Sequence, residues 1–332
     1  MDFLELSNEQ RRQLIDAQQV FAQYRPGSLE LERLGSLIWQ TSKGRRYLCE
    51  QHQKVRKSLG RETSELRAKK EKHDARKKEL TTAVKGLRKR LDAMAPVNRA
   101  LRLGRIPAIA ARILRELDRE NLLGSHIIVA GTNALFAYEA ITGTLLDSQH
   151  VATRDADLLW DSNQSLLLAT TGVPREGLFG ILRRADSSFK TDYGLNPTND
   201  DGYIVDLHCA ENENFQTMKV NSGIEATQMP GLQWLLVPPH LDTVIIAEDG
   251  YPVRIVVPEP RTFALHKLWV SQRDDRDSLK QPRDREHALI VAGLVDKYLR
   301  RSWTARDMPW LPKELKAILK SVFKDLRRKK KK

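Results

Sequence analysis

The chain has 332 residues, 40% of them hydrophobic, and a formal net charge of +13 at neutral pH. This length is enough for about two domains with a buried core, and no apolar run reaches the ~20 residues of a membrane helix, so a membrane-spanning class is excluded. The N-terminus lacks a signal-peptide pattern, and Cys49 and Cys209 match no metal-ligand spacing. We therefore expect a cytoplasmic protein in a reducing compartment.

The positive charge is concentrated in two segments. Residues 42–92 hold eighteen Lys and Arg against seven Asp and Glu, a net of +11, and the tail from residue 327 adds +6. The rest of the chain is mildly acidic, at −4. Basic segments of this kind usually bind polyanions, and nucleic acid is the leading candidate for residues 42–92. The alternative for both segments is a solvated surface that only keeps the protein soluble.

The N-terminal region, residues 1–105, is expected to be helical and basic. Residues 1–40 read as an amphipathic helix with a break at Pro26-Gly27, and residues 50–93 are rich in Lys, Arg and Glu. In this second segment the apolar positions step by 4, 3 and 4, as in a helix–helix seam; they are Leu80, Val84, Leu87 and Leu91. The seam lapses between Leu66 and Leu80, so we favour an antiparallel helical hairpin within residues 42–93 over a continuous coiled coil.

Strands and helices interleave only between residues 106 and 259. In chain order, the expected elements are a helix from Pro107, a strand at 126–130, a helix at 133–141, a strand at 155–160, some helix within 166–185, a strand at 203–209 and a hairpin of 243–247 with 253–257. This alternation predicts an α/β (α+β) core with a small mixed sheet. A helical region at 260–325 and a basic tail at 326–332 complete the chain.

Two aspartates one residue apart, Asp155 and Asp157, lie on the expected strand 155–160. Side chains alternate along a strand, so both carboxylates point to one face and repel each other unless a cation lies between them. Mg²⁺ prefers hard oxygen ligands and shares them with substrate phosphates. Asp206 lies in the second apolar strand, where an acid needs a partner, and completes a three-carboxylate cluster if the two strands are neighbours. Such a cluster can hold two Mg²⁺ for an in-line phosphoryl displacement.

A glycine turn at a helix start supplies the other half of the expected site. Gly131, Thr132 and Asn133 lie where free backbone N–H groups bind phosphate oxygens. Taken singly, each feature has a plainer explanation: Thr132 or Asn133 as a helix cap, and Asp206 in a salt bridge with an arginine. The order of glycine turn, Asp-x-Asp pair and later strand acid is more specific than any one member. His208, on the same strand face as Asp206, is expected to be a packing or supporting residue.

This order of residues resembles the nucleotidyltransferase superfamily of DNA polymerase β, whose signature is an apolar strand, a Gly-Gly or Gly-Ser corner, an Asp-x-Asp or Asp-x-Glu pair and a third acid on a later strand. Thr132 stands where the superfamily usually has Ser or Gly. The interval from Gly131 to Asp155 is longer than the minimal spacing, which implies an extra loop around residues 143–152. Further stretches are similar to a bacterial branch of largely uncharacterised proteins with this fold; they are residues 43–48, 98–105, 131–139, 152–160 and 260–269.

The resemblance implies a nucleotidyltransferase fold and a Mg²⁺- or Mn²⁺-dependent enzyme that transfers NMP from an NTP, such as ATP, to a hydroxyl. The residues that the superfamily pattern assigns to metal binding and catalysis are Asp155, Asp157 and Asp206. A similarity to toxin-type nucleotidyltransferases implies that Lys267, with Arg273 beside it, binds the triphosphate, and it makes an antitoxin-like partner worth testing. The basic residues 42–92 favour RNA or tRNA as the acceptor. The alternatives are a nucleotide- or nucleic-acid-binding protein without turnover, and an enzyme that modifies a protein or small-molecule hydroxyl.

Overall fold

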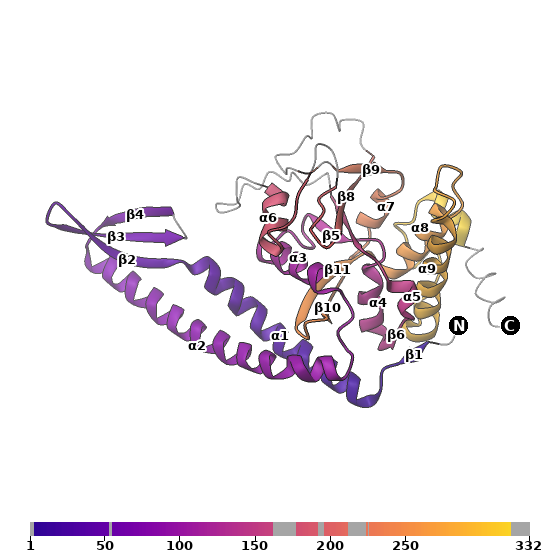
Figure 1. The fold of residues 1–332 in the computed structure, drawn as a ribbon. Helices are drawn as coiled ribbons and strands as arrows, with labels where there is room; N and C mark the ends of the chain where they lie inside the picture. The colour runs from indigo at the N-terminus through magenta and orange to yellow at the C-terminus, as the bar shows by residue number, and fades with distance from the viewer. Residues whose placement is uncertain are drawn as a thin grey trace.

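The structure, a computed structural model, describes residues 3–52, 55–161, 177–191, 196–211, 224 and 226–319. A two-helix arm with a small sheet at its tip projects from an α+β core, and the C-terminal helices lie on the opposite side of the core from the arm (Figure 1). Within those ranges, no helix has both the length and the apolar character needed to cross a membrane.

The arm consists of helices α1 (Asn8–Leu34) and α2 (Ser64–Ala100), joined by an antiparallel sheet of β2 (Ser36–Ser42), β3 (Arg45–His52) and β4 (Val55–Arg61). The expected helical hairpin within residues 42–93 is therefore wrong, because α2 pairs with α1 and strands occupy its first third. The reason is local: Lys43 and Gly44 both have positive φ, 48° and 71°, as a two-residue hairpin turn requires. The high Lys and Arg content of the segment obscured this turn in the sequence.

The contact between α1 and α2 explains where the apolar seam lapses. N-terminal to the buried Leu80, two inward positions of α2 are taken by His73 and Lys77. His73 Nε2 lies 3.1 Å from the carbonyl oxygen of Leu34, and Lys77 Nζ donates to the carbonyl of Gly35 at 2.5 Å. These carbonyls lie at the C-terminal end of α1, where no helical N–H is available to them. Polar residues therefore replace leucines at the level where α1 ends and the sheet begins.

Helix α1 continues through Pro26, where the sequence predicts a break. Gly27 lets the two arm helices approach, because a Cβ there would lie 3.2 Å from Cγ2 of Val84 on α2. Directly before the proline, Nε and Nη2 of Arg25 donate to the carboxylate of Asp118 in the core, at 2.5 and 2.7 Å. Tertiary contacts on either side of the proline thus outweigh the local cost of a helical proline.

Buried polar contacts fix the base of the arm to the core. Asn98 is fully buried, and its Nδ2 donates to the carbonyl of Gly250 at 2.7 Å. Its Oδ1 accepts from Nε2 of Gln13 at 2.8 Å, so one α2 side chain bonds both α1 and the core. An unpaired buried amide would cost about 1–3 kcal/mol, and this pairing therefore favours one orientation of the arm.

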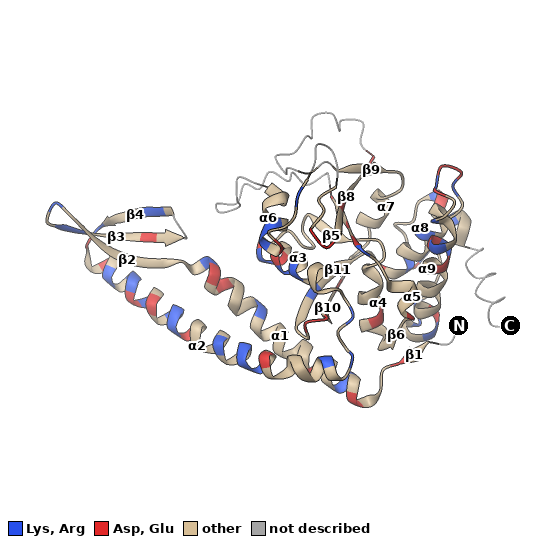
Figure 2. Cartoon of the chain, viewed as in Figure 1, with Lys and Arg blue, Asp and Glu red and all other residues tan. Residues whose placement is uncertain are grey.

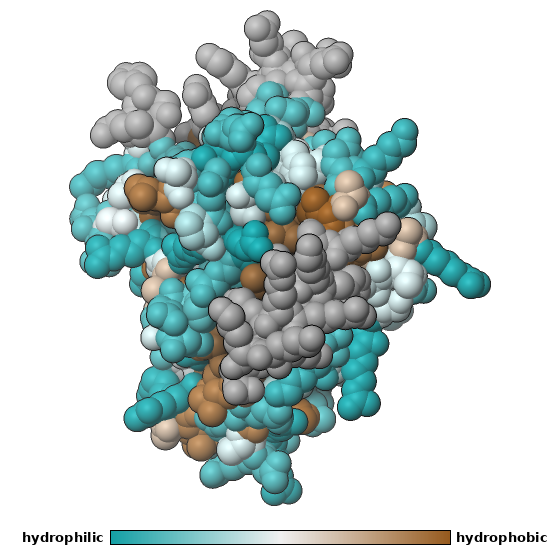
Figure 3. All heavy atoms as spheres, turned by 90° about the vertical axis from the view of Figure 1, so that its right-hand side faces the viewer, coloured by the Kyte–Doolittle hydropathy of each residue, from teal (hydrophilic) through white to brown (hydrophobic). Residues whose placement is uncertain are grey.

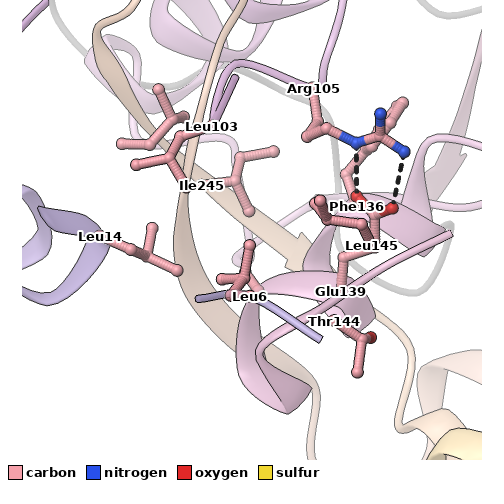
Figure 4. Close-up of a pocket in the computed structure, with 11 residues that line it drawn as sticks. Leu6, Leu14, Leu103, Arg105, Phe136, Glu139, Thr144, Leu145 and Ile245 are labelled. Carbon is pink, nitrogen blue, oxygen red and sulfur yellow. Dashed lines mark hydrogen bonds and ion pairs between the residues drawn. The ribbon is translucent and has the colours of Figure 1, made fainter. Parts of the chain in front are cut away.

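A small pocket marks the junction between the N-terminal segment and the core (Figure 4). Leu6 and Leu14 close one side of it, and Ile245 lies on the other. Arg105 and the buried Glu139 also line it, joined by hydrogen bonds of 2.9 and 3.2 Å. Burial raises the pKa of Glu139 against the opposing effect of Arg105. The charges here are paired and mostly buried, as a structural contact requires.

The core contains a mixed sheet in the order β5-β7-β8-β9, with bounds Ile127–Val129, Asp155–Trp160, Ile204–Ala210 and Thr227–Met229. Strand β5 runs antiparallel to β7, whereas β7, β8 and β9 are parallel. Along β7 and β8 every second residue is buried, for example Leu158 and Leu207, and the residues between them are mostly half-buried. One face of the sheet therefore packs on the core and the other is partly accessible.

Helices and a second ribbon surround this sheet. Their bounds are α3 (Ala108–Arg119), α4 (Ala134–Thr142), α6 (Gly177–Ala185), α7 (Gln233–Leu236), and the antiparallel pair β10 (Leu241–Ile246) and β11 (Pro252–Val257). The predicted hairpin is confirmed, as are the strands at 155–160 and 203–209 to within one residue. The loop expected around 143–152 contains β6 (Thr144–Leu145), paired with β1 (Leu4–Glu5), and the short α5 (Ser148–Val151).

The C-terminal region begins with α8 (Pro260–Val270) and α9 (Gln281–Leu294), followed by a π-helical turn at Val295–Leu299. Residues 300–312 contain no helix, so the expectation of continuous helix after residue 260 holds only in part. The face that carries these helices is mostly hydrophilic, with small apolar areas between polar side chains (Figure 3). The basic tail and residues 166–176 lie outside the described residues.

Candidate active site

The three predicted acids meet on the accessible face of two neighbouring parallel strands. In the register of β7 and β8, Asp157 lies directly opposite Asp206, and Asp155 lies opposite Ile204. Because the side-chain period is two, these positions share one face, together with His208. Alternation along each strand set which residues share a face, and the parallel pairing of the two strands brings the second and third acids side by side.

Gly131 forms a tight corner against Asp157. Its φ is +59°, a left-handed conformation that favours glycine, and a Cβ at this position would overlap the carboxylate of Asp157. The backbone N–H of Ala130 donates to the carbonyl of Asp157 at 2.9 Å, so the corner is bonded to β7. Glycine is therefore required here for two separate reasons, its backbone conformation and the nearness of the acid.

Asn133 holds the backbone of β7 at the start of α4. It is 2% exposed, and its Nδ2 donates to the carbonyl of Asp155 at 2.8 Å. The hydroxyl of Tyr203 donates to the same carbonyl at 3.1 Å. Thr132 beside it is buried, and its carbonyl accepts from the N–H of Leu135 at 3.0 Å. In this structure the Asn133 side chain positions an acid-bearing strand, and the backbone of residues 131–133 forms the corner.

Each of the three carboxylates accepts a hydrogen bond from a neighbouring polar side chain. Thr153 donates to Asp155 and Asn196 donates to Asp206. His208 Nε2 lies 3.1 Å from Oδ1 of Asp157, and the side chains of His208 and Asp157 are 16% and 24% exposed. Contacts of this kind restrict how the carboxylates rotate, which pre-organises them for a ligand.

One group of ligand atoms stands out among the described residues as able to hold a metal ion. Asp157, Asp206 and His208 each offer one atom, and these atoms lie within 4.8 Å of one another. Two carboxylates and an imidazole are chemically suited to a divalent cation. Asp155 shares the strand face but is not a member of this group. The donor set therefore fits a metal ion, with Asp157 and Asp206 at its centre.

The two central carboxylates differ in acidity. Burial tends to raise the pKa of Asp157, but the His208 contact and the positive charges of Lys267 and Lys280 outweigh it, so the pKa lies below its usual value. Burial raises the pKa of Asp206, and the negative charge of Asp157 raises it further. The charge of Asp157 thus disfavours ionisation of Asp206 beside it, which is the situation that a bound cation relieves.

The two predicted cations have different surroundings. Lys267 on α8 donates to Asp284 of α9 at 2.6 Å, and Arg276 bonds the other oxygen of that buried carboxylate at 2.7 Å. The charge of Lys267 nevertheless acts on Asp157. Arg273 instead bonds Asp275 and stacks over the ring of Trp269 at 4.6 Å, so it is not brought together with the three acids.

Two residues near the acids were not selected from the sequence. His208 was interpreted as a packing or supporting residue, although its spacing of two from Asp206 placed it on the same face. Lys280 is exposed at the start of α9, and its charge acts on both Asp157 and Asp206. No sequence signal could have revealed Lys280, because its nearness to the acids depends on how α9 packs.

Comparison with known proteins agrees with the geometry. A family model described as Nucleotidyltransferase matches residues 108–308, which include the glycine corner, the three acids, α8 and α9. No curated protein and no solved structure matches the chain in the corresponding searches. The matched segment is more than half of the chain, and its acids lie together on one sheet face. The chain belongs to the nucleotidyltransferase family, whose members are enzymes that transfer nucleotidyl groups.

Proposed function

We propose that this nucleotidyltransferase uses a divalent cation to transfer NMP from an NTP to a hydroxyl of RNA, releasing pyrophosphate. The observation that carries this proposal is the register of β7 and β8, which sets Asp157 against Asp206 beside the Gly131 corner. A cation held between carboxylates can share its ligands with phosphate oxygens. The corner provides the complementary group, because the first N–H groups of a helix have no intrahelical acceptor.

Asp155, Asp157 and Asp206 would hold the ion or ions, with Mg²⁺ or Mn²⁺ as the candidates. A bound divalent cation would neutralise phosphate charge and favour ionisation of the attacking hydroxyl. The residues of the chain act around it: Thr153 and Asn196 hold Asp155 and Asp206 in place, and the Gly131 backbone leaves room for the Asp157 carboxylate. The positions of Thr153, Asn196 and Gly131 support these roles, because each residue contacts an acid of β7 or β8.

Positive charge for the triphosphate comes from the C-terminal helices. We propose that Lys280 contacts the phosphates directly and that Lys267 contributes mainly through its field, because its ammonium is already bonded to Asp284. The exposed side chain of Lys280 and the effect of its charge on two acids support this assignment. Fixed cations near developing negative charge are among the larger contributions to catalysis.

The arm supports a nucleic-acid acceptor. Helix α2 carries twelve Lys and Arg against five Asp and Glu, whereas α1 carries four of each (Figure 2). At the tip, six described Lys and Arg accompany the single acid Glu50. A basic rod and sheet outside the acidic core would bind a phosphate backbone without sequence choice, which positions an acceptor and leaves the reaction to the core.

The acceptor class is tested by offering the purified protein α-³²P-labelled NTPs and Mg²⁺ with total RNA, a protein mixture or small hydroxyl compounds. We expect the label to enter RNA. Deleting residues 42–92 is not a suitable test of the arm, because it would remove the helix that covers Phe21 and the rest of the apolar seam of α1. A better variant replaces Lys78, Lys85 and Lys89, exposed on one side of α2, with glutamine. Label in protein or in a small molecule, with no change in this variant, would contradict the RNA assignment.

A further inference from the structure

The group of side chains that could hold a metal ion at this site contains an imidazole as well as carboxylates. Asp157, Asp206 and His208 contribute atoms within 4.8 Å of one another. Two ligands on opposite sides of an ion at roughly 2.1 Å stand about 4.2 Å apart, so only a small closing movement would let all three reach one cation. Asp155, by contrast, is outside this group.

We propose that His208 is a ligand of the metal centre and that the mixed nitrogen and oxygen donor set favours Mn²⁺ over Mg²⁺. This rests on the divalent-cation site of the proposed function and adds a ligand and an ion preference to it. Mg²⁺ takes hard oxygen ligands, whereas imidazole nitrogen suits first-row transition ions. Mn²⁺ is suited by carboxylate oxygens, as Mg²⁺ is, but as a first-row transition ion it also takes an imidazole nitrogen.

The strand geometry directs His208 into the site. It lies two residues after Asp206 on β8, opposite Leu159 of β7, so its side chain shares the face of the acids. Its Nε2 lies 3.1 Å from Oδ1 of Asp157 and is thus the nitrogen that faces the carboxylates. An imidazole at this distance offers either a proton to the acid or, in the other tautomer, a lone pair to a cation that the acid also binds.

The second ring nitrogen of His208, Nδ1, places no constraint on the tautomer of the ring. Nδ1 of His208 is buried and has no hydrogen-bond partner among the described residues. A ligating histidine is usually fixed by a hydrogen bond from its second nitrogen, and here no described residue bonds Nδ1. The contact with Asp157 can therefore give way to coordination without breaking any other described bond of the ring.

Mn²⁺ itself is the probe for the test, since it is paramagnetic. In the intact wild-type protein loaded with Mn²⁺ alone, electron spin-echo modulation should show a coupled nitrogen, as from a coordinated imidazole. His208→Gln should remove this signal and weaken Mn²⁺ binding about ten-fold or more by calorimetry. Mg²⁺ binding should change less, because the glutamine amide still offers an oxygen. His150→Gln is the matched control: His150 also lies beside a carboxylate, Glu286 at 3.4 Å, and is 18% exposed.

The alternative role is a hydrogen-bond donor that only positions Asp157. In that case the wild-type protein binds Mn²⁺ without nitrogen modulation, and His208→Gln, which keeps a donor, changes the affinities for both ions by the same factor. Either result overturns the proposal, and the wild-type spectrum does so even if the variant fails to fold. A nitrogen signal in a protein that transfers no nucleotide would instead leave the ligand assignment standing and refute the proposed function.

Discussion

The core and the arm use charged residues in opposite ways. In the core, charges are buried and paired: Asp284 is 3% exposed and bonds two cations, and Asp118 bonds both Arg25 and Arg254. Along α2, cations such as Lys85 and Lys89 are exposed. Buried pairs fix geometry at little net gain in stability, whereas exposed cations supply salt-sensitive attraction. From this comparison we propose that the chemistry depends on a few fixed positions and that acceptor binding depends on many interchangeable ones.

The sharpest test of the fixed positions is Asp157→Asn. The substitution keeps the size of the side chain and removes a carboxylate charge from the candidate metal-binding group. Loss of about 4 kcal/mol of charge stabilisation corresponds to roughly a 10³-fold lower rate of label transfer from α-³²P-NTP. Asp201→Asn, at an exposed position, is the control and should retain wild-type activity. Equal activity of the two variants would place the reaction elsewhere.

Gly131→Ala should have the next largest effect. The added Cβ would displace the carboxylate of Asp157, and the alanine would have to keep the left-handed backbone of the glycine. Gly202→Ala is the control, because the φ there is similar, +75°, but no atom lies within 4 Å of the added Cβ. The left-handed backbone costs roughly 1–2 kcal/mol in both variants. We expect thermal melts to show this shared loss of stability, and activity to fall about 100-fold only in Gly131→Ala. Similar activity in both would mean that the approach to Asp157 is unimportant.

For the exposed lysines of α2 we expect a graded loss of RNA affinity. Replacing Lys78, Lys85 and Lys89 with glutamine should weaken RNA binding by about 10- to 100-fold at 0.15 M salt and reduce the slope of log K against log salt by about 2 to 3. Fluorescence anisotropy over a series of salt concentrations measures both. The control replaces the exposed Arg306, Lys313 and Lys316 of the C-terminal region, with the same change in net charge. An equal loss in the control would mean that net charge alone, and no particular surface, binds RNA.

The smallest expected effect is on the stability of the arm where α1 ends and its sheet begins. Lys77→Met removes the donor to the Gly35 carbonyl directly after α1 and should cost about 0.5–1.5 kcal/mol locally. Hydrogen exchange should rise in residues 36–52 and stay unchanged in β7 and β8. Activity on a short acceptor should be unaffected, since the site lies in the core. Faster exchange throughout the core would show that the arm and the core unfold as one unit.

The sequence was sufficient for the parts that depend on local pattern. Strand alternation placed Asp155 and Asp157 on one face, and the Asp-Gly turn before Tyr251 predicted the hairpin of β10 and β11. The sheet at the arm tip was missed because the Lys43-Gly44 turn lies within a run of basic residues that reads as helix. Recognising it required more weight on one dipeptide than on the composition around it.

Prediction of the site from the sequence depended on assuming that the strand of Asp155 and Asp157 pairs with the strand of Asp206. Asp206 was selected because an acid in an apolar strand needs a partner, and the parallel register supplied one. The contacts made by Lys267 and Arg273 could not be predicted, because both residues lie on or just after α8 and differ only in tertiary neighbours. Asp284 of α9 bonds the first, and Asp275 in the connecting loop bonds the second.

The central claim is that acids on adjacent strands carry out nucleotidyl transfer, and the release of pyrophosphate tests it most directly. Wild-type protein and Asp206→Asn would be incubated with each NTP, total RNA and Mg²⁺ or Mn²⁺, with pyrophosphate measured over time. The account predicts metal-dependent release by the wild-type protein with at least one NTP, matched by nucleotide incorporated into RNA, and a loss of roughly 10³-fold in the variant. Undiminished release by Asp206→Asn, or no release by the wild-type protein with any NTP, would contradict it.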